Sequence, residues 1–202
     1  MNSATGVTAE RGGERRRQIL DALHACVLEQ GYARTTLADV ARAARMSPSH
    51  LLYYFHGKDA ILEHYFQTAA ERIIKRIESF RDEDPKRQID LIAALFFADD
   101  IITKSEIGFM LECFGVAVNH AVLHLNKSEL DQRCKAHLSD LFERTPRGFA
   151  ADAQDSAEVA YAMLIGLRTA VYFDERLELP EAHRLFRTSM LNIAGYTRSP
   201  ER

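Results

Sequence analysis

The 202-residue chain lacks the features that mark membrane, secreted and disulfide-bonded proteins. No apolar run approaches the roughly 18–20 residues that a helix needs to span a bilayer, and no apolar stretch typical of a secretory signal follows the first residues. The three cysteines, Cys26, Cys113 and Cys134, are odd in number and too far apart for a CxxC pair. These absences predict a cytoplasmic protein with reduced thiols and no membrane association.

The common motifs of catalysis are also missing. The chain has no phosphate-binding loop, nucleophile elbow or HExxH motif, so we expect no enzymatic activity. His120 with His124, and separately Cys134 with His137, have spacings that can present two metal ligands from one helix. No further ligands follow at a recognised spacing, so we expect no metal and no other cofactor. An all-helical metal-dependent enzyme is the contrasting hypothesis, and metal analysis of the purified protein separates the two.

Glycine and proline are scarce, at ten and five residues, and fall mostly between segments of helical periodicity. Valine-rich runs with the alternation of strands are absent. The sequence therefore predicts an all-α protein of about nine helices, with disordered ends at residues 1–12 and 197–202. The expected helices cover residues 14–30, 36–44, 47–55, 58–80, 86–102, 104–119, 121–143, 154–174 and 181–195.

Two short helices within the first 60 residues carry strong start signals. Thr36 followed by Asp39 matches a capping box, and Ser47 followed by Pro48 matches an N-cap and a first helical residue. Joined by the turn ARMS, these helices are typical of a helix-turn-helix, whose second helix can lie in the major groove of DNA. The charge has the matching sign, because residues 1–60 carry a net charge of +2 and the remainder −5.

The segment SPSHLLYYF has two faces when it is wound into a helix. Leu51 and Phe55 are spaced to point toward the interior of the domain. A small helical hairpin with surface tyrosines is the alternative, but it does not account for both caps and the short turn. The polar residues left on the outward face, where a groove-binding helix meets base edges, are Ser49, His50, Tyr53 and Tyr54.

Residues 15 to about 66 resemble the DNA-binding domain of the TetR family of bacterial transcriptional regulators. The matching segments are ILDALHACVLEQGYARTTLADVARAA and MSPSHLLYYFHGKDAILEHYF. The chain departs from the family pattern at Arg45, where the turn usually carries glycine, and at Leu52, where tyrosine is common. A non-glycine residue at a positive φ costs about 1 kcal/mol or more, so Arg45 either reshapes the turn or contributes to binding.

The resemblance implies a role at DNA for each matching polar residue. Thr36 and Ser47 would bind phosphates at helix N-termini, and Lys58 would bind another phosphate. Arg16, within the run 15–17, would reach the flanking backbone or the minor groove, although a solvated tail is equally open for this run. Pro48, Ser49 and His50 would approach base edges, and Tyr53 and Tyr54 would lie at bases or backbone. Arg45, a departure from the family pattern, is a further candidate contact to DNA.

The resemblance also implies a two-fold dimer formed by the last two helices. Both helices are amphipathic, and small residues there would allow a close approach of two subunits. The apolar pattern alone leaves an ordinary monomer core open as the alternative. The residues expected at the dimer interface are Ala162, Gly166, Ala170, Leu185 and Met190.

The middle helices mix phenylalanines with small residues, a mixture that can leave a cavity between helices. The resemblance implies an inducer pocket there, and a dense core is the alternative. A weaker resemblance of FADDIITKSEIGFMLECFGVAV to the subfamily containing the repressor of the choline-to-betaine pathway would let Asp99 and Asp100 meet a cation, although a solvated helix end is the simpler interpretation and the sequence names no inducer. The residues expected to line the pocket are Phe97, Phe109, Met110, Cys113, Phe114 and Ala117.

Taken together, the sequence predicts a DNA-binding domain at residues 1–58 and a helical domain for ligand binding and dimerisation at residues 59–202. The expected function is a homodimeric transcriptional regulator, most simply a repressor. It would bind a pseudo-palindromic double-stranded DNA operator and leave it when a small-molecule effector binds. A DNA-bound dimer that a protein partner controls without a small ligand is the alternative.

Overall fold

The computed structural model describes residues 4–98, 103–146 and 152–196. Within these ranges the chain consists of helices, turns and short loops without any strand, and the predicted all-α class is confirmed. No helix in this part of the chain is both long enough and apolar enough to cross a membrane. The helices are α1 (Ala4–Gln30), α2 (Leu37–Ala43), α3 (Pro48–Tyr54), α4 (Lys58–Glu78), α5 (Pro85–Phe97), α6 (Lys104–Ala117), α7 (Ala121–Glu143), α8 (Ala153–Phe173) and α9 (Leu179–Ile193).

Several helices of the larger part start where side-chain oxygens can satisfy the free N–H groups of the first turn. Asp84 accepts a hydrogen bond from the first turn of α5, and Asp152 does the same for α8. Thr103 and Glu106 form a reciprocal capping box at the start of α6. Because these caps are local in sequence, most helix starts are predictable to within a few residues.

Two predicted boundaries were wrong. α1 begins at Ala4 rather than near residue 14, so residues 4–12 are helical rather than disordered. Gly12 and Gly13 each cost a helix about 1 kcal/mol relative to alanine, but no proline interrupts the segment. α5 ends at Phe97 rather than near residue 102, because Ala98 adopts an extended conformation with ψ of 127°. The predicted disordered end at residues 197–202 lies outside the described residues.

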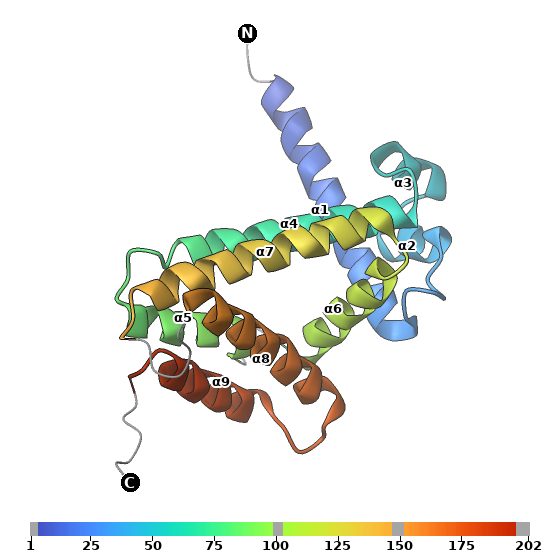
Figure 1. Ribbon diagram of the computed structural model, residues 1–202. Helices are drawn as coiled ribbons and strands as arrows, with labels where there is room; N and C mark the ends of the chain where they lie inside the picture. The colour runs from blue at the N-terminus through green and yellow to red at the C-terminus, as the bar shows by residue number, and fades with distance from the viewer. Residues whose placement is uncertain (1–3, 99–102, 147–151, 197–202) are drawn as a thin grey trace.

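Figure 1 shows a head, formed by α1–α3, set on a body formed by α4–α9. α4 starts at the head and runs beside α7 through the body. α8 packs against α7 and α9, whereas α6 contacts α1, α7 and α8. The first turns of α1 project away from the rest of the molecule. The predicted domain boundary after residue 58 therefore falls in the first turn of a helix that reaches from the head into the body.

The core is one continuous cluster of buried side chains that extends through both parts. The head is centred on Ile19, Leu23, Val40 and Leu51, which have no exposed surface. Burying each side chain of this size contributes roughly 1.5–3 kcal/mol to stability. The largest buried side chains of the body are Phe66, Phe97, Phe109, Phe142 and Phe186.

Candidate nucleic-acid interface and interior cavity

α2 begins with the predicted capping box. Thr36 Oγ1 accepts a hydrogen bond from the Asp39 backbone N–H (3.2 Å), and Asp39 Oδ2 accepts one from the Thr36 backbone N–H (3.0 Å). The Thr36 hydroxyl also donates to this carboxylate (2.6 Å). These bonds lower the pKa of Asp39 to about 2 and keep its carboxylate ionised. The hydroxyl and N–H of Thr36 that were expected to meet a phosphate are thus both used by the cap.

The turn between α2 and α3 keeps the geometry that glycine usually provides. The Met46 N–H donates to the Ala41 carbonyl (3.0 Å) and the Arg45 N–H to the Arg42 carbonyl (3.0 Å), which is the Schellman pairing. Arg45 has a φ of 53°, in the left-handed region where a residue other than glycine is strained by about 1–2 kcal/mol. Arg45 therefore does not reshape the turn, and its side chain is exposed on the head.

α3 has the two faces that its sequence predicts. At its start, the Ser47 hydroxyl accepts a hydrogen bond from the His50 backbone N–H (3.2 Å), and Pro48 is the first helical residue. Leu51 is fully buried, whereas Tyr53 is 82% exposed. The other buried residue of this segment is Phe55, and the other exposed ones are Ser47, Pro48, Ser49, His50 and Leu52.

Tyr54 lies between the two faces, because it is partly buried rather than fully exposed as predicted. Its ring contacts those of Tyr53 (centroids 5.2 Å apart) and His50 (5.4 Å). The Arg16 guanidinium lies 6.0 Å from the Tyr54 ring centroid. Gln18, on the same stretch of α1, donates from Nε2 to the backbone carbonyl at the C-cap of α2 (2.9 Å). The arginine-rich stretch of α1 and the exposed residues of α3 thus share one surface of the head.

Lys58 has structural partners that its sequence position did not reveal. Its Nζ donates to the backbone carbonyls of Tyr32 and Thr35, both at 2.8 Å. The same ammonium lies 4.0 Å from the centroid of the Tyr32 ring, whose hydroxyl hydrogen-bonds Asp59. Lys58 therefore closes the loop between α1 and α2 against the start of α4. A phosphate could reach only the donor that remains on the ammonium.

Replacing Lys58 with methionine is expected to lower the free energy of unfolding by about 1–3 kcal/mol, because two carbonyl oxygens lose their partner. Urea denaturation measures this loss. Lys75→Met, at an exposed site on the same helix, is the control and should change stability little. A Lys58→Met protein as stable as this control would contradict the structural role. If Lys58 also binds a phosphate, the slope of log affinity for DNA against log salt falls by about one.

The body contains an interior cavity of about 560 Å³ between α1, α4, α5, α6, α7 and α8. Three of the six predicted pocket residues, Phe109, Met110 and Phe114, line it. The other three do not line this cavity and are buried in the core. These are Phe97, Cys113 and Ala117.

The polar residues of the wall were not predicted from the sequence. Tyr65 and Arg72 come from α4, Glu106 from α6, and Tyr161 and Arg168 from α8. Burial raises the pKa of Tyr65 to about 12, so its hydroxyl is neutral at physiological pH. The only available signal is helical periodicity, which places Glu106 three residues before the predicted Phe109. For α8 the same signal leaves both a dimer face and a monomer core open.

The cavity reaches the head directly. His24 of α1 lines it, and the His24 ring stacks on Tyr65 of α4 (centroids 5.7 Å apart) and contacts Phe109 of α6 (4.6 Å). A second contact joins α6 to the head, because the Tyr32 backbone N–H donates to Glu112 Oε2 (3.2 Å). Movement of α6 would therefore act on both α1 and the loop that follows it.

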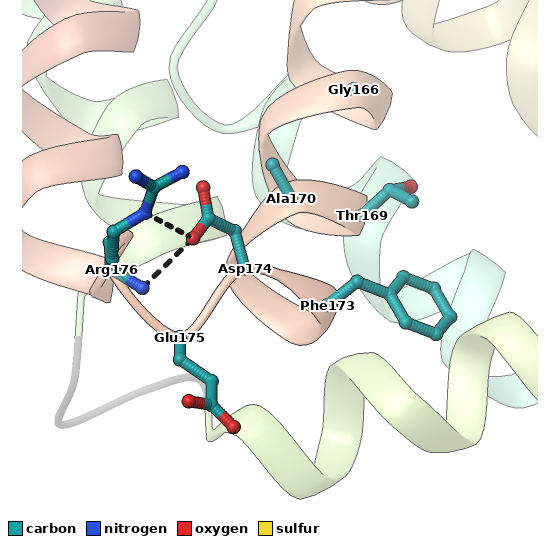
Figure 2. Close-up of a pocket in the computed structure, with 7 residues that line it drawn as sticks. All are labelled: Gly166, Thr169, Ala170, Phe173, Asp174, Glu175 and Arg176. Atoms are coloured by element: carbon teal, nitrogen blue, oxygen red, sulfur yellow. Dashed lines mark hydrogen bonds and ion pairs between the residues drawn. The ribbon is translucent and has the colours of Figure 1, made fainter.

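The outer face of α8 carries small and apolar residues without partners within the described chain. Ala162 and Gly166 are exposed as predicted for an interface, and Ala170 is partly buried. Two further residues of this face, Val159 and Phe173, were not predicted from the sequence and are 59% and 72% exposed. Figure 2 shows Thr169, Ala170 and Phe173 along the last turns of α8, beside a shallow hollow that continues onto Asp174, Glu175 and Arg176.

The two residues of α9 that were predicted at the interface differ in exposure. Leu185 is partly buried, but Met190 has no exposed surface and belongs to the core. Met190 therefore cannot contact a second subunit in this conformation. α9 packs against both α5 and α8, and a strongly amphipathic helix shows which residues are apolar without showing which neighbour covers them.

Of the histidine and cysteine pairs with metal-ligand spacing, three residues are held in the fold and His124 is exposed. Within the described ranges, no three His, Cys, Asp or Glu side chains come together to hold a metal. His120 is the N-cap of α7, and its Nε2 lies 3.5 Å from Glu63 Oε1. Cys134 and His137 are both buried. Burial raises the pKa of Cys134 to about 12, so this thiol is not a ready thiolate ligand.

The capped helix pair, the exposed face of its second helix and the helical body together define a helix-turn-helix regulator. A family model described as "Bacterial regulatory proteins, tetR family" matches residues 19–65, which run from α1 into α4. The chain is a member of the TetR family of transcriptional regulators.

Particular relatives extend the match beyond the head. The chain is 28% identical over 180 residues to the HTH-type transcriptional regulator BetI 2 of Chromohalobacter salexigens, covering 86% of each protein. It is 24% identical over 179 residues to BetI of Escherichia coli, covering 86% of this chain and 90% of that protein. These relatives are named as regulators rather than enzymes.

Solved structures share the fold at lower identity. A TetR transcription regulator from Haloarcula marismortui superposes with a TM-score of 0.78 at 17% identity, covering 91% of this chain and 98% of that one. A transcriptional regulator from Saccharomonospora viridis, solved in complex with choline, gives a TM-score of 0.78 at 15% identity and covers 89% and 96%.

Proposed function

We propose that this DNA-binding transcriptional regulator is a homodimeric repressor that leaves its operator when a small molecule fills the interior cavity. The observation that carries the proposal is the position of His24, which belongs to the first helix of the head and also forms part of the cavity wall. A ligand in the cavity would thus touch the DNA-binding part of the chain itself.

The exposed surface of the head supports the DNA-binding step. His50, Tyr53 and Ser49 project from α3, and Arg16 lies beside them on α1. A short helix with such a face fits the major groove, and arginines on a neighbouring element can contact phosphates. Arg45 is exposed in the intervening turn. These residues are proposed to position the head and read the operator.

The face of α8 supports the dimer. A single α3 reads few base pairs, and two copies related by a two-fold axis would read two half-sites of a pseudo-palindrome. One face of α8 carries four exposed residues at helical spacing: Val159, Ala162, Gly166 and Phe173. We propose that residues 1–58 bind DNA and that residues 59–202 bind the ligand and form the dimer.

The cavity supports control by a small molecule rather than by a protein partner. Its volume of about 560 Å³ lies within the range of pockets that hold small ligands, about 300–1,000 Å³. A ligand that binds better when α6 and α1 are displaced would shift the population away from the DNA-binding geometry. The test is to select bound sequences from a random DNA pool and then to screen metabolites for release of the selected operator.

Glu112 is expected to carry part of this coupling. In Glu112→Ala the hydrogen bond from the Tyr32 N–H to α6 is lost, while the cavity wall is unchanged. We expect near-normal operator affinity without effector but a smaller loss of affinity when a releasing metabolite is added, measured by fluorescence anisotropy. Couplings of this kind are typically worth 1–3 kcal/mol, or about 5–150-fold.

The control for this experiment is Glu129→Ala, which removes an exposed carboxylate from α7. It should release DNA as the unaltered protein does. A Glu112→Ala protein with the full release ratio would show that the head senses the cavity by another route, for example through His24 alone.

A further inference from the structure

The cavity wall contains a cation without a direct ion pair. Arg168 of α8 lines the cavity, is partly buried, and lies 5.7 Å from the centroid of the Phe96 ring. Over the described parts of the chain it forms no hydrogen bond and no salt bridge. Burial lowers the pKa of Arg168 to about 10, against an opposing attraction from Glu106, and the guanidinium stays charged at neutral pH.

The nearby acid of the wall already has partners. Glu106 is the only carboxylate among the described lining residues, and its Oε2 accepts hydrogen bonds from the Thr103 N–H (2.8 Å) and hydroxyl (3.2 Å) at the start of α6. Arg72 and Arg76 add two more cations at exposed positions on the α4 side. The charged groups of the wall are therefore mostly positive.

A partly desolvated charge without a direct partner is costly, and an incoming anion would remove that cost. We infer that the cavity binds an organic anion with an apolar, ring-containing body, and that Arg168 pairs with its carboxylate, sulfonate or phosphate group. The guanidinium offers several donors in one plane, which suits such groups. This inference specifies the effector class of the proposed function and rests on the same cavity.

The rest of the wall fits the body of such a ligand. Aromatic rings from several helices line the cavity, among them Tyr65, Phe109, Phe114 and Tyr161. His24 Nε2 is buried without a hydrogen-bond partner in the described chain. A neutral imidazole can donate or accept at this atom, so it supplies a second polar contact for the ligand.

The choline seen in the Saccharomonospora viridis regulator is a cation, and aromatic faces alone would accept it. The three arginines of this wall oppose a cation, whereas they attract an anion. Asp99 and Asp100, which the weaker family resemblance would let meet a cation, lie outside the described residues. Choline is therefore the natural competing probe.

Two fluorescent probes with the same ring skeleton test the inference. Anilinonaphthalene sulfonate carries an acid group, and phenylnaphthylamine lacks it. Each is titrated into the full-length protein, into Arg168→Met and into Arg133→Met, whose guanidinium pairs with Glu78 and lines no part of the cavity. We expect the sulfonate to bind Arg168→Met at least about tenfold more weakly than the unaltered protein. Phenylnaphthylamine should bind all three proteins alike.

Equal sulfonate affinity for Arg168→Met and the unaltered protein would overturn the inference, as would failure of the sulfonate to bind the unaltered protein. An equal loss of affinity for both probes in Arg168→Met would also overturn it, because Arg168 would then only shape the cavity. Displacement of the sulfonate by millimolar choline, with equal affinity of choline for Arg168→Met, would favour a cation site instead.

The melting temperature of unliganded Arg168→Met should stay level or rise, which keeps the comparison free of unfolding. If a probe binds through Arg168 but does not release operator DNA, this inference holds and the proposed repressor mechanism is contradicted. The two proposals can therefore fail separately.

Discussion

Gly166→Arg is expected to leave the subunit folded but to abolish the dimer, and to lower operator affinity by about a hundredfold or more. Within the described chain, a Cβ added at Gly166 meets no atom within 4 Å, and the residue is exposed on the outer face of α8. Arginine is a better helix former than glycine by about 1 kcal/mol, so the substitution should stabilise α8 itself. The substitution is therefore expected to affect only the contact with a second subunit, against which the arginine side chain would clash.

The loss of affinity follows from the geometry of two-site binding. When one head is bound, the second head of a dimer is held near its half-site at high effective concentration, and a monomer loses this advantage. Analytical ultracentrifugation measures the dimer and anisotropy measures the operator affinity. Gly115→Arg is a matched control, because this glycine is also exposed on a helix and its Cβ also meets nothing within 4 Å.

A Gly166→Arg protein that still sediments as a dimer would move the interface away from this face of α8. A monomer with unchanged operator affinity would contradict the requirement for two heads. Loss of helical signal in either glycine variant would instead indicate that the fold, rather than assembly, had been damaged.

His50→Ala is expected to weaken operator binding by between about thirtyfold and about twenty-thousandfold. One side-chain contact with a base edge is worth about 1–3 kcal/mol, and a two-fold dimer makes it twice. His50 is exposed on α3 and contributes its ring only to a contact with Tyr54, so its removal should not unfold the head. Binding to non-specific DNA should change much less, because phosphate contacts remain.

The control for His50 is His124→Ala, an exposed histidine of the body on α7. It should bind operator and non-specific DNA as the unaltered protein does. Equal weakening of specific and non-specific binding by His50→Ala would assign this histidine to the backbone rather than to a base.

The head is predictable because local chemistry determines it. Thr36 with Asp39 and Ser47 with Pro48 specify two helix starts from neighbouring residues alone. The spacing of Leu51 and Phe55 specifies which side of α3 is buried. The role of Lys58 is harder to predict, because its partners are carbonyl oxygens more than twenty residues away in the sequence. A lysine in a sequence does not indicate which carbonyl oxygens it will contact.

The body is less predictable, because its helices are apolar on more than one side. Phe97 and Met190 have the composition of a pocket wall and an interface, respectively, yet both are covered by other helices of the same chain. Arg168 shows the opposite case, since a charged residue on an otherwise apolar helix faces the cavity. Such positions depend on how helices are oriented against one another, which periodicity does not specify.

The central claim is that the exposed face of α3 reads DNA twice in each dimer. Selection of bound sequences from a random DNA pool, done side by side with the unaltered protein and His50→Ala, tests it most directly. We predict an inverted repeat with half-sites about one helical turn apart, and a preference that relaxes at one position in both halves in the variant. Sequences without an inverted repeat, or identical preferences for both proteins, would contradict the claim.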